Sequence, residues 1–254
     1  KEQGVAILNG DDDKLSTKTM VNGNPAIFYG IGEVPAKDEQ GNALAERSIY
    51  ATDVRNLGFE GMKATIHTPE GEMNVHISIP GEHNVYNALA ATAVGTRLGL
   101  TLAEIQKGIE EAKTIAGRTN LVKTKGMNII DDCYNANPVS MAAALDVLSH
   151  ATGRTIAVLG DMGELGENEK ELHYGVGVCA GEKQIHTLFC AGELAIAYKE
   201  GAKATNPNCE VYYFKTREEM EGALKEYVKE GDSILIKASH FMNFPKVVEV
   251  LTAE

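Results

Sequence analysis

Residues 127–138, Met-Asn-Ile-Ile-Asp-Asp-Cys-Tyr-Asn-Ala-Asn-Pro, run from an apolar strand directly into a helix. Asn137 is expected to cap that helix and Pro138 to take its first position, as is typical of helix N-termini. In parallel α/β sheets, ligands gather where strands end in this way. Asp132 and Asn135 are not needed for capping. A ligand therefore explains them better than the alternative, a turn whose Asx side chains bond their own backbone.

The chain after Gly117 continues this alternation of strand and helix. Short apolar runs predict strands at Met127–Asp131, Thr155–Leu159, Thr187–Cys190, Val211–Phe214 and Ser233–Lys237. Helices are predicted at Pro138–Ser149, Glu169–Ala180, Leu194–Glu200, Glu218–Lys229 and Phe244–Leu251. Repeated βα units predict an α/β fold with a parallel sheet and helices on both faces.

The part before Gly117 has a different pattern. It is β-rich at first, and we expect its strands to be antiparallel, with a hairpin over residues 63–79. An Ala-rich helix follows over residues 82–98, and a second helix begins at a capping box over residues 101–104. The change of pattern predicts two domains that meet near residue 116.

Composition and charge exclude several classes of protein. The 254 residues carry a formal net charge of -12, which opposes binding to nucleic acid and to anionic lipid. The four cysteines form no C-x-x-C pair, so we expect buried or free thiols of a reducing cytosol. No apolar run has transmembrane length, and no signal peptide is recognisable. Because Lys1 stands where Met would begin a gene product, just before a strand-like run, we expect a fragment.

Two segments, one in the Ala-rich helix and one at the domain junction, carry candidate ligand contacts. Asn84 and Asn87 share one face of the Ala-rich helix, and their carboxamides match the hydrogen-bonding edge of adenine. Helix capping by Asn84 and a solvated Asn87 is the alternative, which these residues alone favour. Arg118 could reach a phosphate or ribose, with a surface salt bridge as the more ordinary explanation.

Two strand ends in the second half offer further polar groups. Lys237 and Ser239 follow the last strand and could hold a carboxylate or phosphate, whereas a loop with a solvated lysine fits the sequence equally well. Residues 160–166, Gly-Asp-Met-Gly-Glu-Leu-Gly, invite comparison with a dinucleotide-binding loop, but the glycine spacing is wrong and two acids would repel a pyrophosphate. A Gly-rich turn explains them better. The histidines lack metal-ligand spacing, and the sequence contains no Gly-Lys phosphate loop.

Taken together, these stretches resemble the Mur ligase family of ATP-dependent bacterial cell-wall ligases. The resemblance rests on residues 81–91, 117–118, 131–137 and 160–166, which occur in the family's order. It implies that residues 1–116 are the C-terminal part of the central ATP-binding domain. Residues 117–254 would then be a complete, Rossmann-like C-terminal domain. The UDP-sugar domain, the phosphate-binding loop and the acidic metal ligands of the family would precede Lys1.

The resemblance also implies a reaction and assigns residues to it. The motifs over residues 131–137 and 160–166 are the more specific part of the resemblance. They are most similar to those of the ligase that adds D-alanyl-D-alanine to UDP-N-acetylmuramoyl-tripeptide. In that reaction ATP activates the tripeptide carboxylate as an acyl phosphate, which the dipeptide amine attacks, with Mg2+ held mostly by residues before Lys1. Positions on the ATP side are matched by Asn84, Asn87, Arg118 and Asp132. Positions that face the substrates are matched by Tyr134, Asn135, Asn137, Lys237 and Ser239. No catalytic or metal-ligating residue is assigned, and His240 stands where relatives often carry Arg.

The same resemblance implies a monomer in the bacterial cytoplasm with neither nucleic acid nor membrane as a partner. Three alternatives stay open: another Mur-type or folylpolyglutamate-type ligase, an NAD-binding oxidoreductase domain, and a non-catalytic binding module. We expect Asp132→Ala and Asn135→Ala to reduce turnover without lowering the melting temperature, whereas Asn137→Ala should also lower stability.

Overall fold

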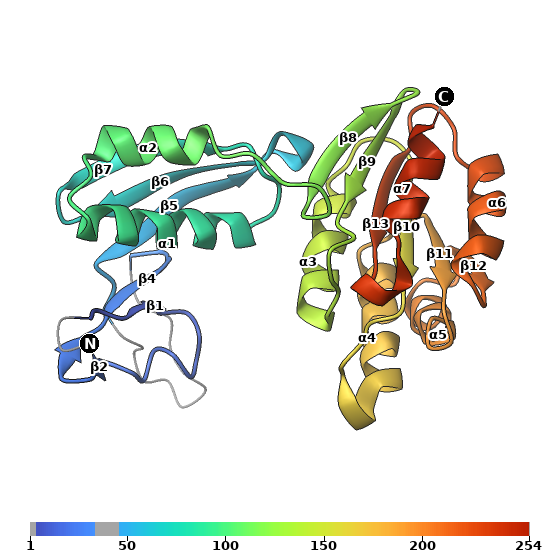
Figure 1. Ribbon diagram of the computed structural model, residues 1–254, viewed down its shortest axis with the longest axis horizontal. Coiled ribbons are helices and arrows are strands. Elements are labelled where there is room, and N and C mark those ends of the chain that lie inside the picture. Colours follow the sequence, from blue (N-terminus) through green and yellow to red (C-terminus); the bar gives the residue numbers. More distant parts are fainter. Residues whose placement is uncertain (1–3, 34–45, 254) are drawn as a thin grey trace. The chain divides into compact units, whose positions relative to one another are not determined.

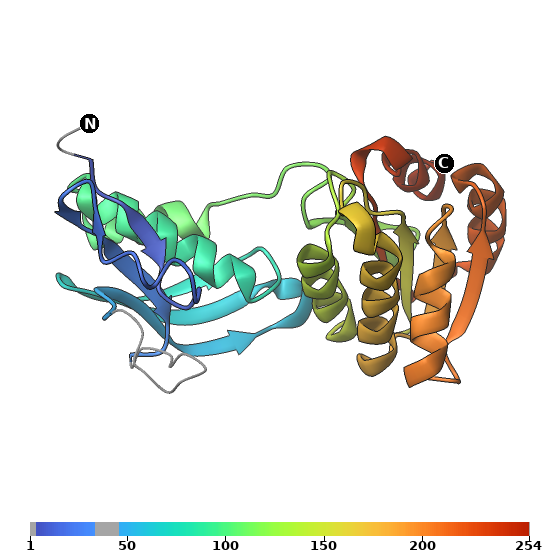
Figure 2. The ribbon, with the colours of Figure 1, turned by 90° about the horizontal axis from the view of Figure 1, so that it is seen from below.

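The chain folds into two compact units, residues 1–113 and 114–254, in a computed structural model (Figures 1 and 2). The structure describes residues 4–33 and 46–253. The units divide between residues 113 and 114, whereas the sequence placed the junction between 116 and 117. None of the described helices is long and apolar enough to cross a membrane.

The first unit contains a five-stranded sheet in the order β1-β4-β5-β6-β7. Its strands are β1 (Ile7–Asn9), β4 (Ile27–Ile31), β5 (Ile49–Asn56), β6 (Met62–Thr68) and β7 (Gly71–Ile77). The β6-β7 hairpin confirms the turn expected at residues 69–70. The β5-β6 and β6-β7 pairs are antiparallel as expected, whereas β1, β4 and β5 pair in parallel, so the expectation of an antiparallel first half was wrong for these three strands. Long connections join these short strands, and strand-like sequence alone does not reveal their relative direction.

Two helices cover one face of this sheet, α1 (His83–Arg97) and α2 (Leu102–Glu110) (Figure 2). The buried residues of β7 alternate along the strand, and they pack with apolar side chains of both helices in one core. Thr101 and Glu104 form the predicted capping box at the start of α2. A two-stranded ribbon, β2 (Met20–Val21) and β3 (Asn24–Pro25), completes the unit's described strands.

The second unit is a six-stranded α/β sheet in the order β12-β11-β10-β13-β9-β8. Its strands are β8 (Asn120–Thr124), β9 (Met127–Asp131), β10 (Thr155–Gly160), β11 (Thr187–Ala191), β12 (Glu210–Phe214) and β13 (Ser233–Lys237). All adjacent pairs are parallel except β8 with β9. The predicted strands after Gly117 are confirmed, whereas β8 was missed.

The sequence did not predict β8, because the turn between β8 and β9 has an unusual residue at its first position. Lys125 and Gly126 both have positive φ, 48° and 72°, which is the conformation of a tight two-residue turn. Asn or Asp normally takes the first of these positions, so a Lys there gives no turn signal.

Helices cover both faces of this sheet, as predicted (Figure 2). They are α3 (Pro138–Ser149), α4 (Glu169–Glu182), α5 (Ile196–Thr205), α6 (Arg217–Tyr227) and α7 (Pro245–Thr252). Apolar residues of α6 and α7 share a core with β9, β10 and β13. The four cysteines are free thiols, and burial raises the pKa of Cys190 on the central part of the sheet.

Candidate functional site

Three neighbouring strands of the second unit, β10, β13 and β9, end at the same edge of the sheet. Parallel strands bring their carboxyl ends together, so the loops that follow them become neighbours although they are far apart in sequence. These loops are residues 132–137, 161–166 and 238–240, which include most of the predicted site residues.

Lys237 is buried at the end of β13, with a relative exposure of 2%. Its Nζ lies 2.6 Å from Oδ2 of Asp132 and donates at 2.9 Å to the carbonyl oxygen of Asn135. The alternative of a solvated lysine is therefore wrong. The ammonium holds the 132–137 loop in place, and a direct contact with a substrate stays a prediction.

Asp132 also has a second structural partner. Its Oδ1 accepts a hydrogen bond from the Thr119 backbone N–H at 2.9 Å, while Oδ2 pairs with Lys237. A carboxylate that neutralises a buried ammonium cannot be removed without a cost in stability. We therefore expect Asp132→Ala to lower the melting temperature, whereas the sequence alone led us to expect no change.

Ser239 joins two of the three loops. Its hydroxyl accepts a hydrogen bond from the Gly163 N–H at 2.8 Å and lies 3.3 Å from the Ala136 carbonyl oxygen, to which it donates. The Ser239 N–H donates to the Asp161 carbonyl oxygen at 3.1 Å. The strand end that carries Lys237 and Ser239 thus fixes the loops on both sides of it.

Arg118 stacks on Tyr134. The guanidinium carbon lies 3.9 Å from the centroid of the Tyr134 ring, and both side chains are exposed. The turn that carries Arg118 is anchored by the Gly117 N–H, which donates at 2.8 Å to Oδ2 of buried Asp131. A cation over an aromatic face is stabilised by the ring quadrupole, so two predicted site residues are ordered together.

Asn135 and Asn137 differ in what their side chains do. Oδ1 of exposed Asn135 accepts only a local hydrogen bond, from Ala136 N–H at 2.8 Å. Oδ1 of Asn137 accepts from Ser140 N–H at 2.8 Å, and the Ser140 hydroxyl accepts from Asn137 N–H at 3.1 Å. The predicted cap of α3 is therefore confirmed.

Asn137→Ala is expected to lower the free energy of unfolding by about 1 kcal/mol, because the α3 cap is lost. Asn137→Ser is the matched control, since serine caps as well as asparagine and should keep near-normal stability. Urea unfolding followed by circular dichroism measures both variants. Equal loss in the two variants would show that capping is not what stabilises this turn.

A cavity of about 390 Å³ opens beside these loops in the second unit. It is lined by Tyr134, Asn135, Gly163, Glu164, Ser239, His240 and Phe241. Three of the predicted substrate-side residues therefore share one cavity. Gly163, Glu164 and Phe241 were missed, because only the strand order brings their loops here.

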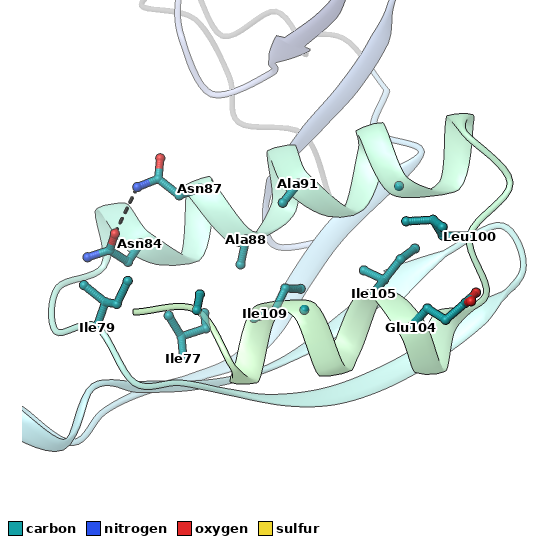
Figure 3. Close-up of a pocket in the computed structure, with 13 residues that line it drawn as sticks. Ile77, Ile79, Asn84, Asn87, Ala88, Ala91, Leu100, Glu104, Ile105 and Ile109 are labelled. Carbon is teal, nitrogen blue, oxygen red and sulfur yellow. Dashed lines mark hydrogen bonds between the residues drawn. The ribbon is translucent and has the colours of Figure 1, made fainter. Parts of the chain in front are cut away.

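The first unit has a separate cavity of about 380 Å³ between α1 and α2 (Figure 3). Isoleucine and alanine side chains form most of its wall, and Asn84 and Asn87 lie at one end (Figure 3). Asn87 Nδ2 donates to Asn84 Oδ1 at 2.9 Å, and Asn84 Nδ2 donates to the Pro80 carbonyl oxygen at 2.8 Å. Asn84 is 8% exposed and does not cap α1, so the capping alternative was wrong.

The end of β10 is unfavourable for a pyrophosphate. The carboxyl group of Asp161 lies at this strand end and accepts a hydrogen bond from the Leu194 N–H at 3.2 Å, so that N–H is not free for a phosphate. The following helix, α4, carries Glu169 and Glu171 in its first turn, which opposes an anion at its N-terminus. The strand-end geometry gives no support to the NAD-binding alternative.

Comparisons with known proteins agree on one family for both units. Residues 1–95 match the Mur ligase middle domain, and residues 117–240 match the Mur ligase glutamate ligase domain. A Bacillus subtilis UDP-N-acetylmuramoyl-tripeptide--D-alanyl-D-alanine ligase is 32% identical over 254 residues, covering 99% of this chain and 52% of the relative.

Solved structures show the same relationship. A crystal structure of MurF from Acinetobacter baumannii has a TM-score of 0.84 and 30% identity, covering 100% of this chain and 52% of that one. The fold is also shared with a MurF ligase from Thermotoga maritima in complex with ADP, at a TM-score of 0.78 and 24% identity, over 99% of this chain and 54% of that one. The chain thus spans about half the length of the relatives it matches.

Proposed function

This chain belongs to the Mur ligase family, and from that premise we propose that it forms the rear part of an ATP-dependent D-alanyl-D-alanine-adding ligase. The acceptor would be UDP-N-acetylmuramoyl-tripeptide, as the name of the Bacillus subtilis relative states for that protein. One observation carries the proposal: residues 132–137, 161–166 and 237–239 meet at one sheet edge and are tied together by Lys237 and Ser239.

In this proposal two domains contribute different binding sites, with the boundary that the family resemblance implies. Residues 1–116 are the end of the central ATP-binding domain, and residues 117–254 are the C-terminal domain. Asn84, Asn87, Arg118 and Asp132 contact ATP. The mixed lining of the first unit's cavity, with apolar walls and an amide pair at one end, suits a flat heterocycle such as adenine. Asn87 is the amide with spare hydrogen-bonding capacity, whereas Asn84 orients it.

The substrates lie against the second unit in this proposal. Tyr134, Asn135, Asn137, Lys237 and Ser239 serve the dipeptide side, with Lys237 and Asn137 fixing the loop that the others share. The tripeptide carboxylate becomes an acyl phosphate at the expense of ATP, and the dipeptide amine attacks it to form the amide and release phosphate. Such loops contribute to the rate by holding both reactants in a fixed geometry.

The described residues contain no group of three or more His, Cys, Asp or Glu that could hold a metal ion. We propose that Mg2+ acts together with ATP and is held mostly by parts of the full-length protein outside this chain. One or two carboxylates together with substrate phosphates are enough to bind it. We further propose a cytoplasmic monomer that binds neither nucleic acid nor membrane.

Another Mur-type or folylpolyglutamate-type ligase is the second candidate. Such an enzyme would share the ATP-side residues and differ in the acceptor amine. Offering the full-length gene product D-alanyl-D-alanine and single amino acids in parallel separates the two proposals.

The chain alone is expected not to hydrolyse ATP, because it has no Gly-Lys phosphate loop to position and neutralise the phosphates. The full-length gene product that contains it should release phosphate and the amide product in equal amounts. A malachite-green assay and mass spectrometry measure the two products. Mg2+-dependent phosphate release by the clean chain alone would contradict the expectation, and an inactive full-length product would contradict the proposed function.

A further inference from the structure

Glu164 adopts a backbone conformation that disfavours its side chain. Its φ is +60°, in the left-handed region that glycine adopts without steric cost and that strains a residue with a Cβ. The same loop has glycine at positions 163 and 166, yet position 164, where glycine would relieve the strain, carries a glutamate. A strained residue next to a cavity suggests a role for its side chain.

The loop before Glu164 is rigidly held. The Met162 N–H donates to Nε2 of buried His173 at 2.9 Å, and the Gly163 N–H donates to Ser239 Oγ. Because His173 Nε2 accepts, the ring carries its proton on Nδ1 and donates it to the Glu169 carbonyl oxygen at 2.6 Å. The His173 ring therefore links the 161–166 loop to the first turn of α4. The backbone thus presents Glu164 at a fixed place.

The chemistry of the cavity identifies what Glu164 could bind. Among the residues that line it in the described part of the chain, Glu164 is the one acid and His240 the one side chain that can carry a positive charge. The aromatic rings of Tyr134 and Phe241 supply apolar surface. Phe241 lies so close to Gly163 that a Cβ there would be 2.9 Å from its Cε1. An ammonium group can pair with the Glu164 carboxylate, and the rest of a small, apolar ligand can pack on the Phe241 ring. The Tyr134 ring already carries the Arg118 guanidinium on one face.

We infer that Glu164 binds the ammonium group of the incoming dipeptide and so determines which amines the enzyme accepts. The inference rests on the proposed function, and it deepens it by assigning the amine end of the substrate to a residue outside the predicted set. Glu164 touches the nucleophile before reaction and orients it. A role of the side chain in this cavity, which Glu164 lines, would explain why a residue other than glycine stands at this strained position.

The test compares Glu164→Gln with the wild type in the full-length gene product. A charge-assisted hydrogen bond lost in a solvent-accessible cavity should raise the KM for D-alanyl-D-alanine roughly tenfold, while the KM for ATP stays unchanged. Propionyl-D-alanine, which is the dipeptide without its amine, should inhibit both proteins with the same inhibition constant. Glu167→Gln is the matched control, because Glu167 is exposed in the same segment and does not line the cavity.

A second variant separates binding from folding. Glu164→Gly removes the Cβ at a positive φ, so the melting temperature should stay the same or rise while the KM for the dipeptide increases as in Glu164→Gln. An unchanged dipeptide KM in both variants, or an equal change for propionyl-D-alanine, would overturn the inference while leaving the ligase activity established. A wild type that forms no amide bond would overturn the proposed function and the inference together.

Discussion

Asp132→Ala should lower the free energy of unfolding of the second unit by about 3 kcal/mol, because the buried ammonium of Lys237 loses its counter-ion. Lys237 and Asp132 have side-chain exposures of 3% and 15%, which puts the effect at the lower end for a buried pair. The variant also frees the Thr119 N–H, and it leaves the Asn135 carbonyl oxygen as the remaining partner through which Lys237 holds the 132–137 loop. Ligase turnover should therefore fall together with stability, as measured by urea unfolding and a coupled ATPase assay.

The matched control for this pair is Lys183→Met. Lys183 pairs with Asp146 on the surface, where the side chains are 32% and 34% exposed, so the loss should stay below about 1 kcal/mol. Replacing both partners of the buried pair, in Asp132→Leu with Lys237→Met, should recover most of the stability but not the turnover. If Asp132→Ala costs no more than Lys183→Met, the buried pair does not hold the site together.

Gly177→Ala should destabilise the second unit by about 3 kcal/mol or more, because α4 and α5 cross there without room for a methyl group. A Cβ at Gly177 would lie 2.2 Å from the Tyr198 carbonyl oxygen, and one at Gly201 would lie 2.2 Å from the Tyr174 carbonyl oxygen. Backbone atoms of a packed helix cannot move aside as a side chain can, so the helices must separate. Differential scanning calorimetry of the full chain measures the shift in melting temperature.

Gly175→Ala is the control, two residues away on the same helix. A Cβ at Gly175 would meet nothing within 4 Å, and the residue is exposed. Helix propensity then favours alanine, and the free energy of unfolding should rise by roughly 0.5–1 kcal/mol. Opposite signs for two identical substitutions on one helix would confirm the close crossing, whereas two stabilised variants would contradict it.

The parts of the fold that the sequence predicts are those with strong local signals. Buried runs such as Ser233–Lys237 and capped helices such as Pro138–Ser149 have the bounds that the sequence indicates. The direction of β1, β4 and β5 and the existence of β8 depend on long connections and on a turn with Lys125 in a left-handed conformation. The local pattern of apolar and polar residues predicts neither the direction of these three strands nor the existence of β8.

The site was predictable residue by residue but not as an assembly. Polar residues after an apolar strand pointed to Asp132 and Asn135, and to Lys237 and Ser239 separately. Lys237 and Asp132 are 105 positions apart, and they become partners only because β13 lies beside β9. The same is true of the Glu164 loop, which the sequence alone shows as a Gly-rich turn.

The strand order has a consequence for how this unit is made in the cell. β13 is the last strand along the chain, yet it lies between β10 and β9 in the interior of the sheet. Until the ribosome has released residue 237, the sheet exists as two halves, each with an unpaired apolar edge. Pairing strands from distant positions is slow, and such edges promote aggregation of the unfinished chain. The order of synthesis therefore makes this unit a strong candidate for chaperone protection during translation.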